Sequence, residues 1–252
     1  MLSTLDHAKW LPITPDTDAS LRLFCIPFAG GGVSMFRGWQ EYLPHNVQLC
    51  PVALPGREKR MAEKSITNIA ELTDILCTLL TPYTDKPFIL FGHCFGGCLA
   101  FETARKLHSR GTSPAMLAVS GCRAPHIEPP LKIADLPSDS FTEALRRFKL
   151  TPETVLDIPD LLALFIPTLR ADFKMDETYR YTESLPVFDF PVAVMFGDED
   201  AIIPQECITP WQGYAHTPVT LTQFNGGHVF FADNPGPMLH AIFTALDGTV
   251  KH

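Results

Sequence analysis

Several features that mark whole classes of protein are missing from this sequence. No run of Lys or Arg occurs in its 252 residues, and 20 basic against 28 acidic residues give a net charge of −8. Nucleic-acid binding needs basic patches that neutralise phosphates, so this balance argues against it. No stretch approaches the roughly 20 consecutive apolar residues of a membrane-spanning helix, and residues 1–20 lack the basic start and apolar stretch of a secretory signal. We therefore expect a soluble, cytoplasmic protein with no nucleic-acid or membrane partner.

Cysteine occurs seven times, but in no arrangement that predicts a disulfide framework or a metal site. The count is odd, no CxxC pair is present, and no His/Cys cluster has the spacing of zinc ligands. The cysteines are Cys25, Cys50, Cys77, Cys94, Cys98, Cys122 and Cys207. We expect no metal and no cofactor, and we interpret all but Cys94 as buried thiols in a reducing compartment.

Apolar runs of strand length alternate with helical patterns through most of the chain, which predicts a mostly parallel sheet with helices on both faces. The 46% hydrophobic content suffices for one large core, so we expect a single α/β domain over residues 1–252. Helices are predicted over 69–79 and over about Phe95–Ser109, with Gly111 ending the second. The predicted strands are Leu21–Ile26, Val47–Ala53, Phe88–Phe91, Ala115–Ser120, Val192–Phe196 and Val219–Phe224.

The alternation fails between about 124 and 185, where two helical stripes occur without any predicted strand. Phe141, Leu145 and Phe148 form the first stripe, and the second should break or kink at Pro167, which has no N–H to donate. An insertion between late strands of an open sheet lies above their carboxyl ends, where such folds bind ligands. We predict a helical lid over this region; the alternative is that it only extends the core.

The strongest local signal is a nucleophile motif between a predicted strand and a predicted helix. Residues 92–96 read GHCFG, which fits the nucleophile elbow G-x-S-x-G with cysteine in the serine position. The elbow is a strained turn, and its flanking glycines avoid collisions with the neighbouring strand and helix. The helix N-terminus favours a thiolate and any oxyanion that forms. We predict that Cys94 is the nucleophile; the alternative is one more buried thiol, as expected for Cys98.

Nine histidines are candidates for the general base that such a nucleophile needs. His228 is favoured because it ends the segment FNGGH, a glycine-rich loop just after the last predicted strand. His93 is rejected because its side chain should point away from that of Cys94. The remaining histidines lie near the termini, in helices or in polar loops, where we expect them to be solvated.

The acid that orients the histidine should follow the strand Val192–Phe196. The order nucleophile, acid, histidine is the one that this type of fold uses. Three carboxylates are available in the loop GDEDAII, and spacing alone does not decide among them. We favour Asp200, because Asp198 follows the strand too closely to reach across. Its role would be to fix the histidine tautomer and stabilise the imidazolium.

An oxyanion hole is expected from two backbone N–H groups. One belongs to Phe95, and the second belongs to the loop after the first strand, where FAGGG lets the backbone approach a substrate closely. Ala29 is the candidate for that second donor. A dinucleotide-binding loop is the alternative, but the glycines do not fit G-x-G-x-x-G and no acidic residue follows at the required distance.

Beyond these motifs, the chain resembles the type II thioesterases that accompany polyketide synthases and nonribosomal peptide synthetases. The resemblance covers nearly the whole chain in the family order. Its matching segments are LFCIPFAGGGVSMFRGW, VALPGRE, FGHCFGGCLAFETARKL, VSGCRAPH, LRADFKMDETYRY, MFGDEDAIIP and FNGGHVFF.

The resemblance implies an α/β-hydrolase fold with a mobile helical lid and the hydrolysis of acyl groups from the phosphopantetheine arm of acyl or peptidyl carrier proteins. Carried over by position, the family triad falls on Cys94, Asp200 and His228. Cys94 departs from the family, which normally has serine there. A cysteine would form a thioester acyl-enzyme, and slow attack by water would favour transfer to an amine, alcohol or thiol.

Two alternatives to the carrier-protein thioesterase stay open. One is an acyltransferase or a cyclising, product-releasing thioesterase on the same scaffold, and the other is a non-catalytic module that binds carrier proteins. We expect a monomer. Because carrier proteins are acidic like this chain, docking would need a local basic patch, and Arg57, Lys59 and Arg60 are the candidates.

Overall fold

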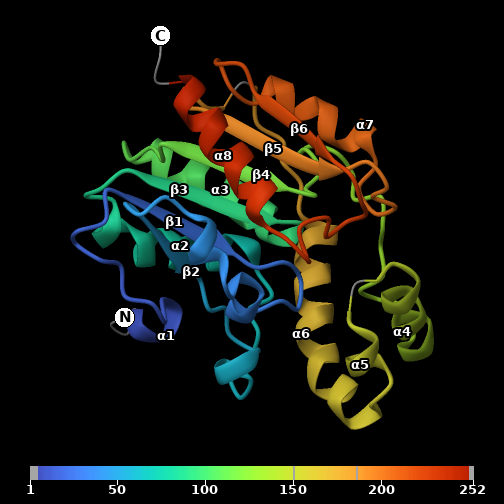
Figure 1. The fold of residues 1–252 in the computed structure, drawn as a ribbon. Coiled ribbons are helices and arrows are strands. Elements are labelled where there is room, and N and C mark those ends of the chain that lie inside the picture. The colour runs from blue at the N-terminus through green and yellow to red at the C-terminus, as the bar shows by residue number, and fades with distance from the viewer. Residues whose placement is uncertain (1–4, 150, 186, 250–252) are drawn as a thin grey trace.

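A single sheet of six parallel strands forms the centre of the computed structural model, which describes residues 5–149, 151–185 and 187–249. The strands lie in the order β2-β1-β3-β4-β5-β6 (Figure 1). All six predicted strands are present, with ends displaced by at most two residues. The bounds are β1 Leu21–Ile26, β2 Val47–Pro51, β3 Phe88–His93, β4 Met116–Ser120, β5 Val192–Gly197 and β6 Thr220–Phe224. The predicted α/β-hydrolase fold is confirmed.

Helices and short 3-10 turns connect these strands. The helices are α1 His7–Trp10, α2 Ile69–Leu80, α3 Phe95–Ser109, α4 Ser138–Arg147, α5 Glu153–Leu156, α6 Pro159–Thr178, α7 Gln205–Ile208 and α8 Gly236–Thr249. The 3-10 turns are η1 Val33–Phe36, η2 Trp39–Tyr42, η3 Glu58–Arg60, η4 Thr81–Tyr83 and η5 Thr209–Gly213. The bounds of α3 are the predicted ones. Gly111 follows with φ +83°, the left-handed conformation that ends a helix and favours glycine.

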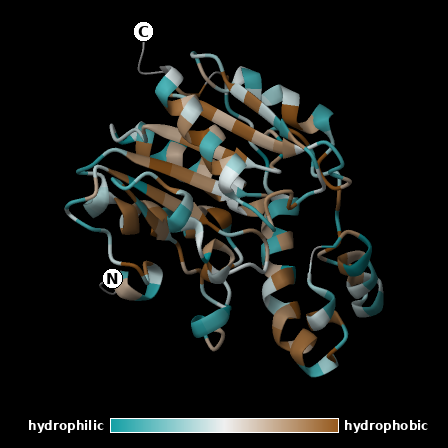
Figure 2. Cartoon of the chain, in the orientation of Figure 1, coloured by the Kyte–Doolittle hydropathy of each residue, from teal (hydrophilic) through white to brown (hydrophobic). Residues whose placement is uncertain are grey.

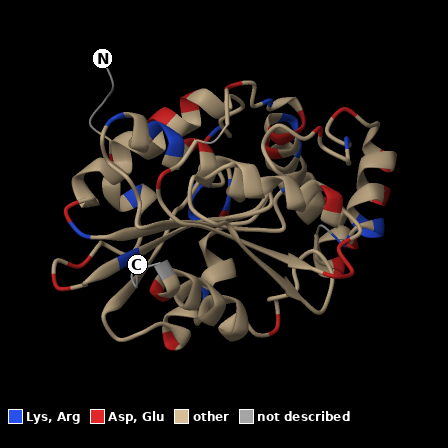
Figure 3. Ribbon diagram, turned by 90° about the horizontal axis from the view of Figure 1, so that it is seen from above, with Lys and Arg blue, Asp and Glu red and all other residues tan. Residues whose placement is uncertain are grey.

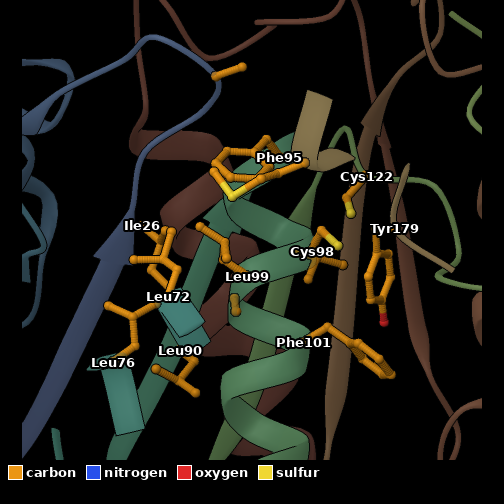
Figure 4. Packing of buried hydrophobic residues seen from close by; sticks show 14 of the residues in the cluster. Ile26, Leu72, Leu76, Leu90, Phe95, Cys98, Leu99, Phe101, Cys122 and Tyr179 are labelled. Atoms are coloured by element: carbon orange, nitrogen blue, oxygen red, sulfur yellow. The ribbon is translucent and has the colours of Figure 1, made fainter. Parts of the chain in front are cut away.

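Two hydrophobic layers cover the sheet because side chains alternate along each strand. On β1, Phe24 and Ile26 enter one layer and Leu23 and Cys25 enter the other. Helices α2 and α3 pack in the first layer, where α3 contributes Leu99 (Figure 4). Helix α8 packs in the second. Strands β1 to β5 are therefore buried on both faces, as their hydrophobic sequences require, whereas the edge strand β6 is partly exposed.

The predicted insertion consists of α4, α5 and α6, which lie beyond one end of the sheet (Figure 1). Phe141 and Leu145 are fully buried, so the first predicted stripe is confirmed. Of the predicted break or kink at Pro167, the break does not occur, since α6 continues through the proline. Pro167 lies on the exposed side of α6, and so does Ala163, whose carbonyl loses its helical partner. Water can solvate that carbonyl, which reduces the cost of proline there.

Polar and apolar side chains are segregated around this framework. Figure 2 shows hydrophobic residues along the central strands, and Figure 3 shows most charged residues on the surrounding helices and loops. Large apolar side chains are exposed at the far end of the insertion, where Ile158 and Leu164 are more than half exposed. Among the residues that the structure describes, no helix has both the length and the apolar character needed to cross a membrane.

Candidate active site

Cys94 lies on a strained turn between β3 and α3. Its φ is +54°, which is unusual for a residue with a side chain. A Cβ on Gly92 would lie 2.0 Å from the Gly96 carbonyl oxygen, and one on Gly96 would lie 2.4 Å from the Ile26 carbonyl oxygen. Both glycines are therefore required by close backbone contacts. Cys94 is partly exposed, whereas the other six cysteines, which all lie in the described part of the chain, are buried.

His228, which is partly buried, and the buried Asp200 form a hydrogen-bonded pair at the same end of the sheet. His228 Nδ1 lies 2.7 Å from Asp200 Oδ2. The other carboxylate oxygen accepts hydrogen bonds from the N–H groups of Ile202 and Ile203, at 2.8 and 3.0 Å. These bonds fix the carboxylate, and the carboxylate in turn holds the imidazole by one nitrogen. The second nitrogen, Nε2, is left free for chemistry.

Electrostatics favour the protonated form of His228. Burial lowers its pKa, but the charge of Cys94 and the hydrogen bond with Asp200 outweigh burial and raise the pKa to about 10. His228 Nε2 is buried without a hydrogen-bond partner among the described residues. Cys94 and His228 line the same pocket. The pocket therefore holds a thiol and an imidazole, and the imidazole is hydrogen-bonded to a carboxylate.

Asp198 has a different place from Asp200. Its carboxylate accepts a hydrogen bond of 2.8 Å from the N–H of Gly226, and the N–H of Glu199 bonds to the Gly226 carbonyl at 2.9 Å. Asp198 therefore fixes the loop that precedes His228 and does not contact the imidazole in any hydrogen bond. The preference for Asp200 as the histidine's partner agrees with this geometry.

His93 lies directly beneath the candidate base, a contact that sequence reasoning missed. Its ring is 4.7 Å from that of His228 and fully buried. Its Nδ1 lies 3.2 Å from the Ser120 hydroxyl. Burial and the charge of His228 lower the pKa of His93 well below its usual value, so it remains neutral. The sequence offers one indication of this position: side chains alternate along β3, so residue 93 lies on the face opposite Gly92.

The two proposed oxyanion donors lie on neighbouring segments. Ile26 pairs with Gly92 in the sheet, so the loop after β1 starts beside the elbow. Ala29 lines the pocket together with Cys94, and Phe95 begins α3. Within the described part of the chain, neither N–H donates a hydrogen bond to another residue. Both N–H groups therefore remain candidates for the oxyanion hole.

The pocket at Cys94 is mostly apolar and measures about 430 Å³. Its walls come from the elbow, the loop after β1, the loop around His228 and the insertion. The lining residues are Phe28, Ala29, Cys94, Lys149, Thr151, Pro152, Glu153, Phe173, His228, Val229 and Ala232. The insertion thus contributes to the site. Over residues 5–149, 151–185 and 187–249, no three His, Cys, Asp or Glu side chains come together as a metal site would require.

The basic patch predicted for carrier docking is wrong. Arg57 is buried and forms an ion pair with Asp172, and Arg60 is buried against Glu63. Only Lys59 of the three is exposed. Sequence alone places three cations close together, but the two arginines are paired inside the protein and present no positive surface.

Comparison with known proteins identifies the family. The thioesterase domain family matches residues 21–246. Gramicidin S biosynthesis protein GrsT of Aneurinibacillus migulanus is 34% identical, over 92% of this chain and 91% of that protein. The probable anguibactin biosynthesis thioesterase AngT of Vibrio anguillarum is 30% identical, over 89% and 91%. The structure of the type II thioesterase BorB from the borrelidin biosynthetic cluster superimposes with a TM-score of 0.84 at 30% identity, covering 97% of this chain and 99% of that one. The chain therefore belongs to the thioesterase domain family and is a thioester hydrolase of the α/β-hydrolase fold.

Proposed function

We propose that this chain is a type II thioesterase that removes acyl groups from the phosphopantetheine arm of carrier proteins in polyketide or nonribosomal peptide biosynthesis. The observation that carries the proposal is the convergence of Cys94 with the His228–Asp200 pair in an apolar pocket. Relatives whose names place them in gramicidin S and anguibactin biosynthesis support the pathway class.

In the first step Cys94 is the nucleophile. Its thiolate attacks the substrate carbonyl while His228 is protonated, so a new C–S bond forms and the carbonyl oxygen becomes an oxyanion. The N–H groups of Ala29 and Phe95 stabilise that charge. The intermediate then collapses, the bond to the pantetheine sulfur breaks, and His228 gives its proton to the departing thiolate.

In the second step water releases the acyl group. His228, now neutral, takes a proton from a water molecule that attacks the Cys94 thioester, and the same two N–H groups stabilise the second oxyanion. The bond to Cys94 then breaks, which yields a carboxylic acid and restores the thiolate beside a protonated His228. Asp200 holds the ring in one orientation and stabilises its charged form in both steps.

A cysteine nucleophile is also compatible with a second function, acyl transfer. A cysteine stores the acyl group as a thioester, which retains the reactivity of the carrier thioester, whereas serine would store it as a less reactive ester. The presence of Cys94 therefore favours acyl transfer to an amine, alcohol or thiol as the second candidate. A non-catalytic carrier-binding module is disfavoured by the complete set of Cys94, His228 and Asp200.

Intact-mass spectrometry after incubation with an acyl-phosphopantetheinyl carrier protein tests the proposal, with free acid measured in parallel. We expect an acyl adduct on the wild type, no adduct on Cys94→Ala, and acid release that depends on Cys94. A lasting adduct without acid, or a product formed with an added amine, would indicate the acyltransferase. Absence of both adduct and turnover over several acyl groups would contradict the catalytic assignment.

A further inference from the structure

A buried ion pair joins helix α6 of the insertion to the body of the protein. Arg57, in the loop after β2, contacts Asp172 of α6 with both terminal nitrogens, at 2.7 and 3.0 Å. Arg57 is 4% exposed and Asp172 is 1% exposed. Burying two charges is costly unless the geometry and the additional hydrogen bonds are good. We therefore ask which further hydrogen bonds this buried pair makes and what they hold in place.

The same carboxylate holds the glycine loop beside the candidate oxyanion donor. Asp172 Oδ2 accepts a hydrogen bond of 2.7 Å from the N–H of Gly30, the residue after Ala29. Arg57 donates a further bond of 3.2 Å to the carbonyl of Gly31. Gly30 has φ +75°, and a Cβ there would lie 2.3 Å from Leu169 of α6. Helix α6 thus packs directly on this loop.

Glu58 holds the other half of the loop. Its carboxylate accepts hydrogen bonds of 3.0 Å from the N–H groups of Val33 and Ser34. A Cβ on Gly32 would lie 2.3 Å from that carboxyl group, so the loop and the side chain are in close contact. Arg57 and Glu58 are neighbours in sequence, and together they fix the segment from Gly30 to Ser34.

We propose that Arg57, Glu58 and Asp172 are positioning residues that hold the N–H of Ala29 in the geometry needed to stabilise the oxyanion. This inference rests on the proposed function. Asp172 alone would place a negative charge one residue from the oxyanion donor and would oppose the charge that develops there. Arg57 offsets that charge and orients the carboxylate, so the pair fixes the loop without an electrostatic penalty.

Three substitutions test the inference. Arg57→Lys keeps the charge but loses the two-pronged contact, and Asp172→Asn keeps the shape but loses the ion pair. Glu58→Ala changes an exposed residue, so it provides a test if a buried substitution prevents folding. We expect the rate of Cys94 acylation by an acyl-phosphopantetheinyl carrier to fall about 10-fold to 100-fold, mainly in kcat and with little change in KM.

Two readouts separate positioning from general damage. Alkylation of Cys94 by iodoacetamide needs the thiolate but no oxyanion donor, so its rate should stay within about twofold of the wild type. A trifluoromethyl ketone adds to Cys94 and forms an oxyanion, so its affinity should fall by the same factor as kcat/KM. Arg22→Lys is the matched control. Arg22 is also buried and paired, with Asp85 at 2.5 Å, but it lies near the opposite end of β1.

The outcomes are distinct. Slower acylation with unchanged alkylation in the folded variants, and little effect of Arg22→Lys, supports the inference. Unchanged acylation in the folded variants, or a parallel loss of acylation and alkylation, overturns it while leaving the proposed function intact. Failure of the wild type to form an acyl adduct overturns the proposed function and this inference with it.

Discussion

The imidazole of His93 packs against the imidazole of His228, with 4.7 Å between the ring centroids and 49° between the ring planes. His93 is fully buried, and the edge-to-face contacts of its ring with Phe28 and Phe231 hold it in place. A neutral, packed ring at this distance limits the orientations available to His228. His93 therefore supports His228 from within the protein, and its lowered pKa excludes it as a competing cation.

Replacing His93 with Phe tests whether His93 only packs against His228 or also transfers a proton. Phe keeps a flat ring but cannot carry a proton, so we expect kcat to stay within about 10-fold of the wild type. His228→Ala should lower kcat by about 10²-fold to 10⁴-fold, because it removes the general acid and base. Steady-state hydrolysis of an acyl thioester measures both. A loss in His93→Phe as large as that in His228→Ala, in a folded protein, would show that His93 takes part in proton transfer.

Replacing Cys94 with Ser tests the consequence of a thioester intermediate. We expect Cys94→Ser to release free acid with little accumulation of acyl-enzyme and to divert less product to an added amine, because an ester is less reactive to amines than a thioester. The ratio of amide to acid at a fixed amine concentration is the measurement. Cys94→Ala, which should lose at least about 10³-fold in kcat, is the control. Equal ratios for Cys and Ser would remove the argument for acyl transfer.

The pH dependence of acylation should follow the protonation of His228. Its pKa is raised to about 10, so the imidazolium persists through neutral pH and is lost as the pH rises through about 10. We expect kcat/KM for acylation to decline on this alkaline side, where the acid for the departing thiol is lost. In Asp200→Asn the decline should move to lower pH, because Asp200 contributes to the raised pKa. If the wild type and Asp200→Asn lost activity over the same alkaline pH range, Asp200 would not contribute to the raised pKa of His228.

The proline inside α6 should cost stability. Pro167 removes one helical hydrogen bond, and Pro167→Ala restores the N–H that can bond to the exposed carbonyl of Ala163. We expect the free energy of unfolding in urea to rise by about 1–3 kcal/mol. Pro159→Ala is the control, since Pro159 is the first residue of α6, where proline is well tolerated. A destabilised Pro167→Ala variant would show that proline there makes a favourable contact.

The apolar pocket should limit the length of the acyl chain. Ala232 lines the pocket, and Ala232→Phe would fill part of its volume of about 430 Å³. Each methylene excluded from an apolar site loses about 0.8 kcal/mol, or roughly fourfold in kcat/KM. We therefore expect a progressive loss with longer acyl chains and little change for acetyl. An equal loss of kcat/KM at all chain lengths would instead show that the acyl group does not bind in this pocket.

Local sequence patterns were enough to predict the framework of the site. The apolar runs predicted the strands, because β1 to β5 are buried on both faces and must be largely hydrophobic, whereas the edge strand β6 is partly exposed. The glycines around Cys94 predicted the elbow, because backbone contacts there leave no room for a Cβ. Short loops after two successive late strands then predicted Asp200 and His228, since the carboxyl ends of parallel strands meet at one edge of the sheet.

Only the tertiary structure decided how distant polar residues are paired. From its own segment, Arg57 was predicted to be a surface cation. It is buried because it pairs with Asp172, which lies 115 residues later in the chain. The contact of His93 with His228 likewise joins segments that are remote in sequence. Local patterns report the period and the sterics of the backbone, whereas burial and charge pairing are set by segments that meet only in the folded chain.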